Sequence, residues 1–174
     1  MNAARCSIMS INSASREEFV RVIGPAFEHS PWIAEAAWAA RPFINVEALH
    51  HALVQVVHNA GEEKKLALIR AHPDLVGRAA LAGTLTPESN REQASAGLGK
   101  LTPEEIAVFE TNNRAYRVKF GFPFVICARL NKKAAILTGF EERLQNTRTQ
   151  EIAAALEEIG KIAWLRLKDL LADV

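Results

Sequence analysis

Apolar residues recur along this chain at intervals of three and four, the spacing that places them on one face of an α-helix. Residues 46–60 predict such a helix, with Leu49, Leu53, Val56 and Val57 facing inward. A longer run begins at Thr147 or Thr149, ends near Ala172, and keeps the same period at Ile152, Ala155, Leu156, Ile159, Ile162, Ala163, Leu167 and Leu170. The pattern predicts an all-α fold with about seven or eight helices.

Residues that start and stop helices interrupt this pattern at regular points. The predicted starts are a capping box from Ser15 to Glu18, Ser30 with Pro31, a second capping box from Thr102 to Glu105, and Asn131. The predicted stops are Arg41-Pro42 for a helix over 32–40, Gly61 after 46–60, and Gly121 for a helix that runs to about Lys119. The helix started by Asn131 is expected over 132–145. The connections between helices are therefore short.

One apolar run does not read as helix. Residues 120–129, FGFPFVICAR, combine a proline with aromatic and β-branched side chains, which favour an extended backbone. No second strand is evident to pair with this run, so its main-chain amides must find other partners. It is either a buried connector or a segment whose amides bind a ligand.

The densest set of reactive side chains lies between residues 70 and 97. The helix over 62–70 must stop near His72, because Pro73 pushes the preceding residue out of the α region. Thr86 followed by Pro87 then starts a new helix. On that helix Ser89, Glu92, Gln93 and Ala96 share one face. An imidazole at a helix exit and a carboxylate beside an amide would suit acid/base chemistry on a small polar molecule.

Length and composition narrow the class of protein. With 174 residues, about half of them apolar, the chain predicts one domain over residues 1–174, with residues 1–12 as a loosely ordered N-terminal extension. The net charge of +1, with acids and bases interspersed, disfavours nucleic acid as a partner. Cys6 and Cys127 lack the CxxC spacing of a zinc site or redox motif.

The same sequence predicts a cytoplasmic protein. It has no apolar run of about 20 residues and no secretory signal pattern at its start, so no membrane association is expected. Two widely separated cysteines suit a reducing compartment. The final residues are not a peroxisomal tripeptide of the Ser-Lys-Leu type.

Two other functions compete at this stage. His72-Pro73-Asp74 could be a docking loop in a helical protein-interaction module, as in J-domains, although Leu75 to Ala80 lack the polar, lysine-rich loop expected there. Such a module would stimulate a chaperone ATPase. A metal-dependent hydrolase would use His50, His51 and His58, yet no HExxH pair or carboxylate cluster completes a ligand set. Sensitivity to chelators would identify the hydrolase. These three histidines are better read as surface or rim residues.

Several motifs together resemble the 2-oxo-4-hydroxy-4-carboxy-5-ureidoimidazoline (OHCU) decarboxylase family. They extend from about Ser15 to Leu170, and their order and spacing are specific where each alone would be weak. They are EHSPW at 28–32, RPF at 41–43, HPDLVGR at 72–78, LTPES with EQ and AGL between 85 and 98, and KFGFPFVICAR at 119–129. The resemblance implies an all-helical enzyme, commonly a homodimer, that needs no cofactor or metal. It catalyses the last step of urate oxidation to (S)-allantoin and is linked to urate oxidase and 5-hydroxyisourate hydrolase.

The resemblance also assigns roles to residues of this chain. It implies that His72 and Glu92 are catalytic, and that the substrate contacts Pro73, the segment Ser89, Asn90, Arg91 and Gln93, and the segment Phe124, Val125, Ile126, Cys127 and Ala128 through its main chain. Gln93 would bind the ureido or ring amides. Either Arg129 or Arg166 would bind an anionic group, and an arginine among the apolar positions of the last helix needs an anionic partner in any case.

The chemistry fits this set of residues. Loss of carbon dioxide from a carbon beside an imine-like ring position leaves electrons that spread into the ring. The protein then has to orient the leaving carboxylate, stabilise the enol-like charge and deliver a proton to one face. We expect Glu92 to fix the substrate hydroxyl and the charge state of His72, and His72 to supply the proton. Delivery to one face predicts a single allantoin enantiomer.

Overall fold

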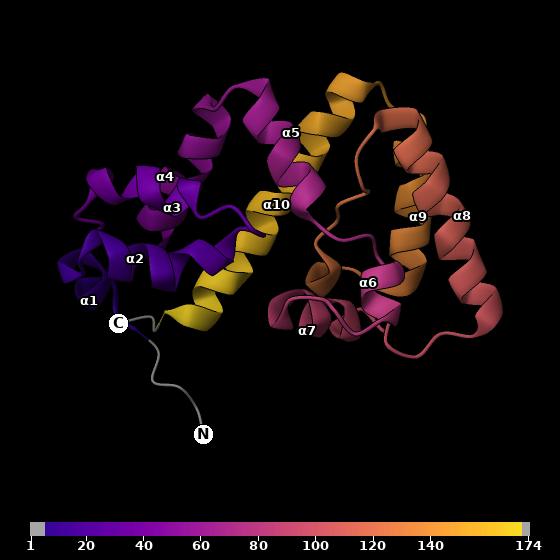
Figure 1. Cartoon of the computed structure of the whole chain (residues 1–174), viewed down its shortest axis with the longest axis horizontal. Helices are drawn as coiled ribbons and strands as arrows, with labels where there is room; N and C mark the ends of the chain where they lie inside the picture. The colour runs from indigo at the N-terminus through magenta and orange to yellow at the C-terminus, as the bar shows by residue number, and fades with distance from the viewer. Residues whose placement is uncertain (1–5, 172–174) are drawn as a thin grey trace. The chain divides into compact units, whose positions relative to one another are not determined.

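The computed structural model describes residues 6–171, and within them the fold is all-helical, as the pattern predicted (Figure 1). The only extended pairing among these residues is an isolated bridge between Cys6 and Leu171. The chain forms two compact units: one from residues 6–68 with 160–171, the other from 69–159. That both units make up one domain stays a prediction.

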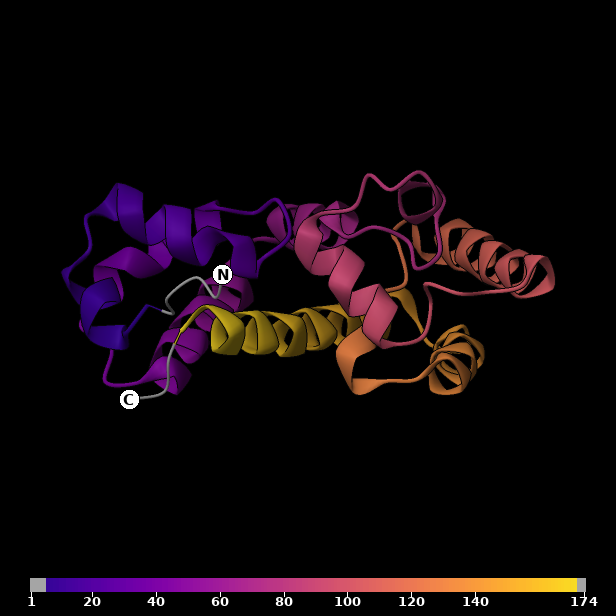
Figure 2. The same cartoon turned by 90° about the horizontal axis from the view of Figure 1, so that it is seen from below.

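The first unit contains the N-terminal helices and the end of the last one. Its elements are α1 (Ile8–Ser13), α2 (Arg16–Ile23), η1 (Gly24–Ala26), α3 (Trp32–Ala37), η2 (Trp38–Ala40), α4 (Val46–Asn59), most of α5 (Glu62–Ala71) and the C-terminal part of α10 (Arg148–Leu170) (Figure 2). The predicted inward positions Leu49, Leu53 and Val57 are buried. They pack in a core with Phe19, Ile33 and Leu167, which are also buried.

The loosely ordered extension predicted for residues 1–12 is wrong from Cys6 onward, and residues 1–5 lie outside the described part. Ser7 caps α1 through a capping box with Ser10. Asn12 exchanges two hydrogen bonds of 2.8 Å with the main chain of Phe43, and Ile11 is buried. A cap, a buried aliphatic side chain and a long-range amide pair fix this segment, and hydrophobic periodicity detects none of the three.

Two predicted helix starts are also corrected. Residue 31 is itself the cap of α3, and no side-chain bond from Ser30 closes that end. Lys132, not Asn131, precedes α9 (Lys133–Arg143), because the Asn131 amide donates instead to the Cys127 carbonyl at 3.0 Å. Ser15 caps α2 as predicted, by accepting from the Glu18 N–H. The other half of the predicted capping box does not form, because the Glu18 carboxylate accepts from Arg21 instead.

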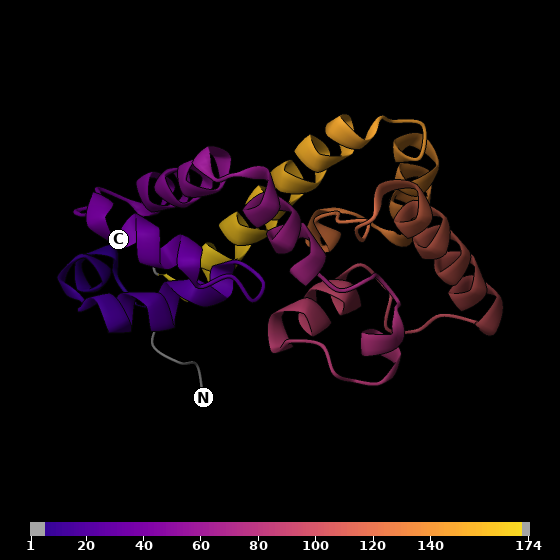
Figure 3. The ribbon, with the colours of Figure 1, turned by 45° about the horizontal axis from the view of Figure 1, so that its top comes forward.

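The second unit contains the middle of the chain. Its elements are the end of α5, α6 (Arg78–Leu81), α7 (Pro87–Ser95), α8 (Pro103–Phe120), η3 (Ala128–Leu130), α9 and the N-terminal part of α10. In Figures 1 and 3, α6 and α7 lie side by side, and α8 packs against α9. The core of this unit is aromatic and consists of Phe109, Tyr116, Phe120, Phe122, Phe124 and Phe140.

The longest helix of this unit is bounded as the sequence predicted. Thr102 and Glu105 form the capping box that starts α8, and Gly121 ends it in the left-handed conformation at φ 80°. Glycine adopts this φ without steric cost, whereas other residues rarely do. The helix therefore ends at Gly121, and the chain turns into the segment 122–127. Of the predicted nonhelical run 120–129, residues 122–127 are not helical, whereas Phe120 ends α8 and Ala128 and Arg129 belong to η3.

None of the helices in residues 6–171 has the length and apolar composition needed to cross a bilayer.

Candidate active site

His72 follows α5 directly and is buried, with 6% of its surface exposed. Its main-chain N–H donates to the Ile69 carbonyl at 3.2 Å, which closes the helix end before Pro73. The Nε2 atom of the ring is buried and makes no hydrogen bond within the described residues, although the residue has other interactions. An imidazole in this position is screened from bulk water.

Helix α7 begins as predicted, with Thr86 accepting from the main chain of Ser89 and Pro87 at the first position. Ser89 and Gln93 are buried, and Glu92 on the same side is half-buried. Asn90 and Arg91 are exposed. The structure therefore brings part of the predicted 89–93 segment to the inner face of α7 and leaves the other two side chains on the outer face.

The buried amide of Gln93 is bonded to the turn that follows His72 and Pro73. Its Oε1 accepts from the Val76 N–H at 3.0 Å, and its Nε2 donates to the Asp74 carbonyl at 3.4 Å. The sequence predicts that this amide binds the substrate. In the structure it connects α7, which carries Glu92, to the turn beside His72.

The segment 124–128 lies buried, apart from the half-buried Ile126. Its unpaired amides were the problem that the sequence raised, and two of its main-chain groups are bonded by charged side chains. Arg143 donates to the Val125 carbonyl at 2.7 Å, and the Glu158 carboxylate accepts from the Cys127 N–H at 2.7 Å. The Cys127 carbonyl accepts from Leu130 and Asn131. These groups are already occupied by the protein itself.

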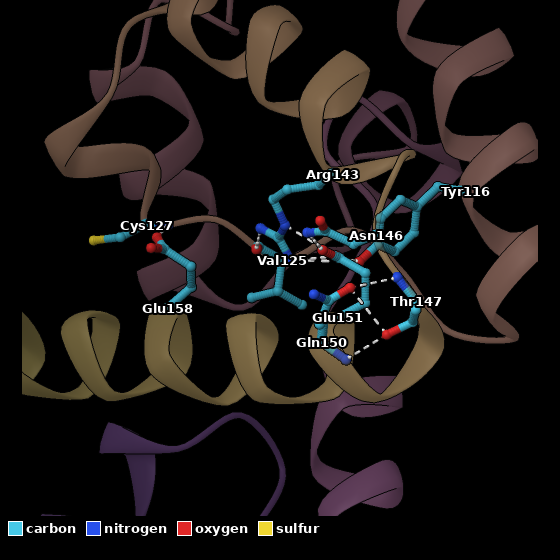
Figure 4. A network of polar contacts seen from close by, with 9 residues as sticks. All are labelled: Tyr116, Val125, Cys127, Arg143, Asn146, Thr147, Gln150, Glu151 and Glu158. Atoms are coloured by element: carbon cyan, nitrogen blue, oxygen red, sulfur yellow. Dashed lines mark hydrogen bonds and ion pairs between the residues drawn. The ribbon is translucent and has the colours of Figure 1, made fainter.

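A buried carboxylate organises the contacts around this segment (Figure 4). Glu151 has no exposed surface and receives hydrogen bonds from Tyr116, from Arg143 at 2.9 Å and from Asn146 at 2.7 Å. Burial, and then the bond to Glu151, raise the pKa of Tyr116 well above its ordinary value. The Arg143 guanidinium lies over the Phe124 ring, 4.5 Å from its centroid. One charged group thus holds both the main chain and a side chain of the segment.

Helix α7 packs against η3, the turn that follows the segment. Burial raises the pKa of the Cys127 thiol, and the carboxylates of Glu158 and Glu92 raise it further. The described contacts therefore join three parts of the predicted site: the turn after His72, the helix with Glu92, and the segment 124–128.

The two predicted arginines differ. Arg129 is exposed and belongs to η3, in the second unit with His72. Arg166 is buried in the first unit, where it forms an ion pair of 2.9 Å with buried Glu28 and donates to the Pro25 carbonyl at 3.3 Å. The anionic partner that the sequence required for Arg166 is thus a glutamate of the EHSPW motif. Contact of either arginine with substrate stays a prediction.

The histidines of α4 lie where the sequence placed them. His51 and His58 are exposed, and His50 is half-buried with its Nε2 2.8 Å from the Gly160 carbonyl. Within residues 6–171 no three His, Cys, Asp or Glu side chains gather in a group that could hold a metal ion.

Sequence reasoning missed Asn113, which is buried in α8 and donates to the Leu75 carbonyl at 2.8 Å. A signal for it was present, since Phe109, Asn113, Tyr116 and Phe120 share one face of the helix and only Asn113 is an amide. Glu158 was missed too. It lies on the long amphipathic helix α10, and its position in the sequence pattern did not distinguish it from the other glutamates of that helix.

The sequence model of the OHCU decarboxylase family matches residues 12–168. A 2-oxo-4-hydroxy-4-carboxy-5-ureidoimidazoline decarboxylase from Halalkalicoccus jeotgali is 40% identical over 166 residues, which are 95% of this chain and 92% of that protein. The uric acid degradation bifunctional protein of a Bacillus species is 38% identical over 95% of this chain and 32% of its own length. A crystal structure of (S)-allantoin synthase superposes with a TM-score of 0.76 at 29% identity, over 96% of this chain and 54% of that one.

Proposed function

We propose residue roles for this chain from the premise that it belongs to the OHCU decarboxylase family. The chain is a carboxy-lyase that converts OHCU to (S)-allantoin in urate degradation. The observation that carries this function is the match over residues 12–168 together with about 40% identity to a named decarboxylase along nearly the whole chain.

His72 is the proton donor in this proposal. Decarboxylation breaks the bond between C4, the ring carbon that also carries the hydroxyl, and its carboxylate. The electron pair forms a C4–C5 double bond, and the imine nitrogen takes up the charge and a proton. The C4 hydroxyl then loses its proton as it becomes a carbonyl, and a proton must reach C5, the carbon with the ureido group, from one side. An imidazole has an unperturbed pKa of about 6.5, so this type of side chain can hold and release a proton in the physiological range. What supports the role is the place of His72, enclosed at the end of α5 beside a turn that the Glu92 helix holds.

Glu92 orients the substrate and sets the charge of His72. A carboxylate close to an imidazole favours its protonated form, which is the form that donates. The same carboxylate can accept a hydrogen bond from the substrate hydroxyl. The support is its position on the inner side of α7, one residue before the amide that bonds Val76.

The segment 124–128 supplies main-chain contacts to the ring oxygens. Because Arg143 and Glu158 already occupy the Val125 carbonyl and the Cys127 N–H, the groups offered to substrate are others in the segment. Pro73 in the turn after α5, with Ser89 and Gln93 on α7, completes the proposed contacts. Fixed dipoles of this kind stabilise charge without having to reorganise during the reaction.

The test generates the unstable substrate in place from urate with urate oxidase and 5-hydroxyisourate hydrolase, then follows its decay. The wild-type chain should accelerate the decay, and His72→Gln should lose about 10²- to 10⁴-fold, the usual contribution of general acid catalysis. Glu92→Gln should also lose activity. His51→Gln, an exposed histidine of α4, is the control and should retain full activity. Decay at the uncatalysed rate with wild-type protein would refute the function.

The proposed partners of this chain are enzymes that act in the same pathway. The bifunctional relative joins a region similar to this chain to further sequence in a uric acid degradation protein, which links the chain to that pathway. The proposed suppliers of its substrate are urate oxidase and 5-hydroxyisourate hydrolase. The proposed compartment is the cytoplasm, and its support is that Cys6 and Cys127 are both free thiols.

The proposed assembly is a homodimer. Helix α8 exposes Val108 and Val118, the latter with 82% of its surface accessible, on the same side as Thr111 and Ala115. Its exposed acids lie in the first half and its exposed bases in the second, so two antiparallel copies would be complementary in charge. Light scattering should show a dimer that Val118→Glu weakens. Ile44→Glu, on the first unit and equally exposed, should not.

A further inference from the structure

The turn after His72 and Pro73 has a conformation that its own residues do not favour. Val76, a β-branched residue, has a positive φ of 54°, which such side chains rarely adopt. The Gly77 N–H donates to the Asp74 carbonyl at 3.3 Å, and a Cβ added at Gly77 would lie 2.7 Å from the Asp74 Cβ. A strained turn of this kind persists only where the surrounding structure fixes it.

Side chains from α7 and α8 bond each of the three residues of this turn, Asp74, Leu75 and Val76. From α7, Gln93 bonds the Val76 N–H and the Asp74 carbonyl, as described above. From α8, Asn113 donates to the Leu75 carbonyl at 2.8 Å. One helical turn further on, the Arg117 Nε lies 3.0 Å from each carboxylate oxygen of Asp74. We call Gln93, Asn113 and Arg117 the turn clamp.

Asn113 is the informative member of the clamp. It is buried on the apolar face of α8, and its Oδ1 has no hydrogen-bond partner within the described residues. An unsatisfied buried acceptor lowers stability, so a leucine here would remove one penalty while creating another at the Leu75 carbonyl. A gain in stability therefore does not account for an amide at position 113. Its hydrogen bond to Leu75, which fixes the backbone conformation there, does account for it.

The clamp acts on His72 through a short and stiff connection. Only Pro73 separates His72 from Asp74, and the proline ring fixes its own φ. The connection between the turn and the histidine is therefore short and has one torsion fewer than an ordinary residue would give it, so a displacement of the turn moves His72. Catalysis is sensitive to such displacements, since a misplacement of about 1 Å can cost about 100-fold in rate.

We propose that Asn113 and Arg117 are positioning residues that set the orientation of His72 by fixing the Asp74–Val76 turn. They contact neither His72 nor substrate in this proposal. Its catalytic consequence rests on the proposed function, whereas its geometric consequence, a change at the His72 ring when the clamp is removed, does not.

The experiment compares four variants of the full chain. Asn113→Leu removes the bond to Leu75, Arg117→Gln removes the ion pair with Asp74, and Arg117→Lys keeps the charge without the guanidinium. Lys133→Gln is the matched control, because the Lys133–Glu105 pair has side-chain exposures of 39% and 33%, close to the 44% and 24% of Arg117 and Asp74. Circular dichroism gives the folded fraction of each.

Two measurements follow on each variant. The first is the NMR resonance of the His72 ring, identified by its loss in His72→Gln, and its midpoint in a pH titration. The second is kcat/KM for OHCU. Asn113→Leu and Arg117→Gln should shift the His72 resonance and lower kcat/KM by about 10- to 100-fold at an unchanged folded fraction. Arg117→Lys should recover part of the rate, and Lys133→Gln should change neither quantity.

The contrary results are distinct. An unchanged His72 resonance in Arg117→Gln and Asn113→Leu would overturn the proposal, as would a rate that falls only in proportion to the folded fraction. If Asn113→Leu does not fold, Arg117→Gln on the surface decides alone. If wild-type protein has no decarboxylase activity, the proposed function fails, and the His72 resonance still decides whether the clamp positions the ring.

Discussion

Two irregular stretches of backbone in the second unit, the Asp74–Val76 turn and the segment 124–128, are both held by side chains from neighbouring helices, but by different chemistry. The segment depends on buried charge: Arg143 bonds the Val125 carbonyl and pairs with Glu151, which has no exposed surface. The turn depends on neutral amides and on a half-exposed ion pair. Loss of a buried charge partner costs far more free energy than loss of an exposed one. We therefore expect the segment to determine stability and the turn to determine activity.

The largest effect is expected at Arg143. Arg143→Met leaves the Glu151 carboxylate buried with Tyr116 and Asn146 as its neutral donors. Leaving a buried charge without its partner should lower the free energy of unfolding by about 3 to 5 kcal/mol, measured by urea denaturation. The double variant Arg143→Met/Glu151→Gln should recover part of that loss. Equal stability of the single variant and the wild type would show that the ion pair does not support the segment.

Gly77→Ala is expected to have an intermediate effect on stability and a large effect on activity. The added methyl group would meet the Asp74 Cβ at 2.7 Å, so the turn has to open. Overpacking of this kind costs about 1 to 3 kcal/mol. Alanine at Gly61, where nothing lies within 4 Å of the added atom, is the matched control for thermal unfolding and for kcat/KM. A fully active Gly77→Ala protein would mean that the turn tolerates movement.

Asp74→Asn should change stability least among these variants. Its partner Arg117 is 44% exposed at the side chain, so solvent screens the pair and less than about 1 kcal/mol is at stake. Its kcat/KM should nevertheless fall. Asp74→Asn should thus lose kcat/KM with little loss of unfolding free energy, whereas Arg143→Met should lose mainly unfolding free energy. If the two losses stand in the same proportion in both variants, the two stretches do not differ in role.

A titration tests the buried charge without mutation. Tyr116 is the only tyrosine of the chain, so tyrosinate absorbance reports on it alone. Burial and the bond to Glu151 raise its pKa in the folded state, whereas the unfolded chain should titrate near the ordinary value of about 10. The neutral phenol is thus favoured by folding. Its contribution to stability is fully present below about pH 10 and is lost as the pH rises above it. Ionisation in the native protein at the same pH as in urea would contradict the network.

The helices that carry the candidate site were predictable because their signals are local. Thr86 with Pro87, the Thr102 capping box and Gly121 each act within four residues, and each bounds its helix as expected. The contacts that join the site are not local: Gln93 reaches a residue 17 positions away, and Asn113 one that is 38 positions away. No periodicity encodes such pairs, so the sequence identified His72 and Gln93 but not the bonds between Gln93 and the turn.

The family resemblance supplied the function that the isolated residues left open. From residues alone, a docking loop at 72–74 was an alternative that Leu75 to Ala80 disfavoured, whereas residues 120–129 were equally compatible with a plain connector and a ligand-binding segment. The structure adds that Asp74 of this loop is paired with Arg117, and that the connector's main chain is bonded at Val125 and Cys127. The resemblance assigned substrate contacts to the whole segment 89–93. Asn90 and Arg91 in that segment are exposed on the outer face of α7, a difference that only the structure reveals.

The most direct test of proton delivery by His72 is the optical activity of allantoin formed from OHCU, measured by circular dichroism at increasing enzyme concentration. Wild-type protein should give (S)-allantoin whose enantiomeric excess approaches completeness as enzyme outcompetes the spontaneous reaction. His72→Gln should give racemic product at every concentration. Optically active allantoin formed by His72→Gln at the wild-type rate would contradict the account.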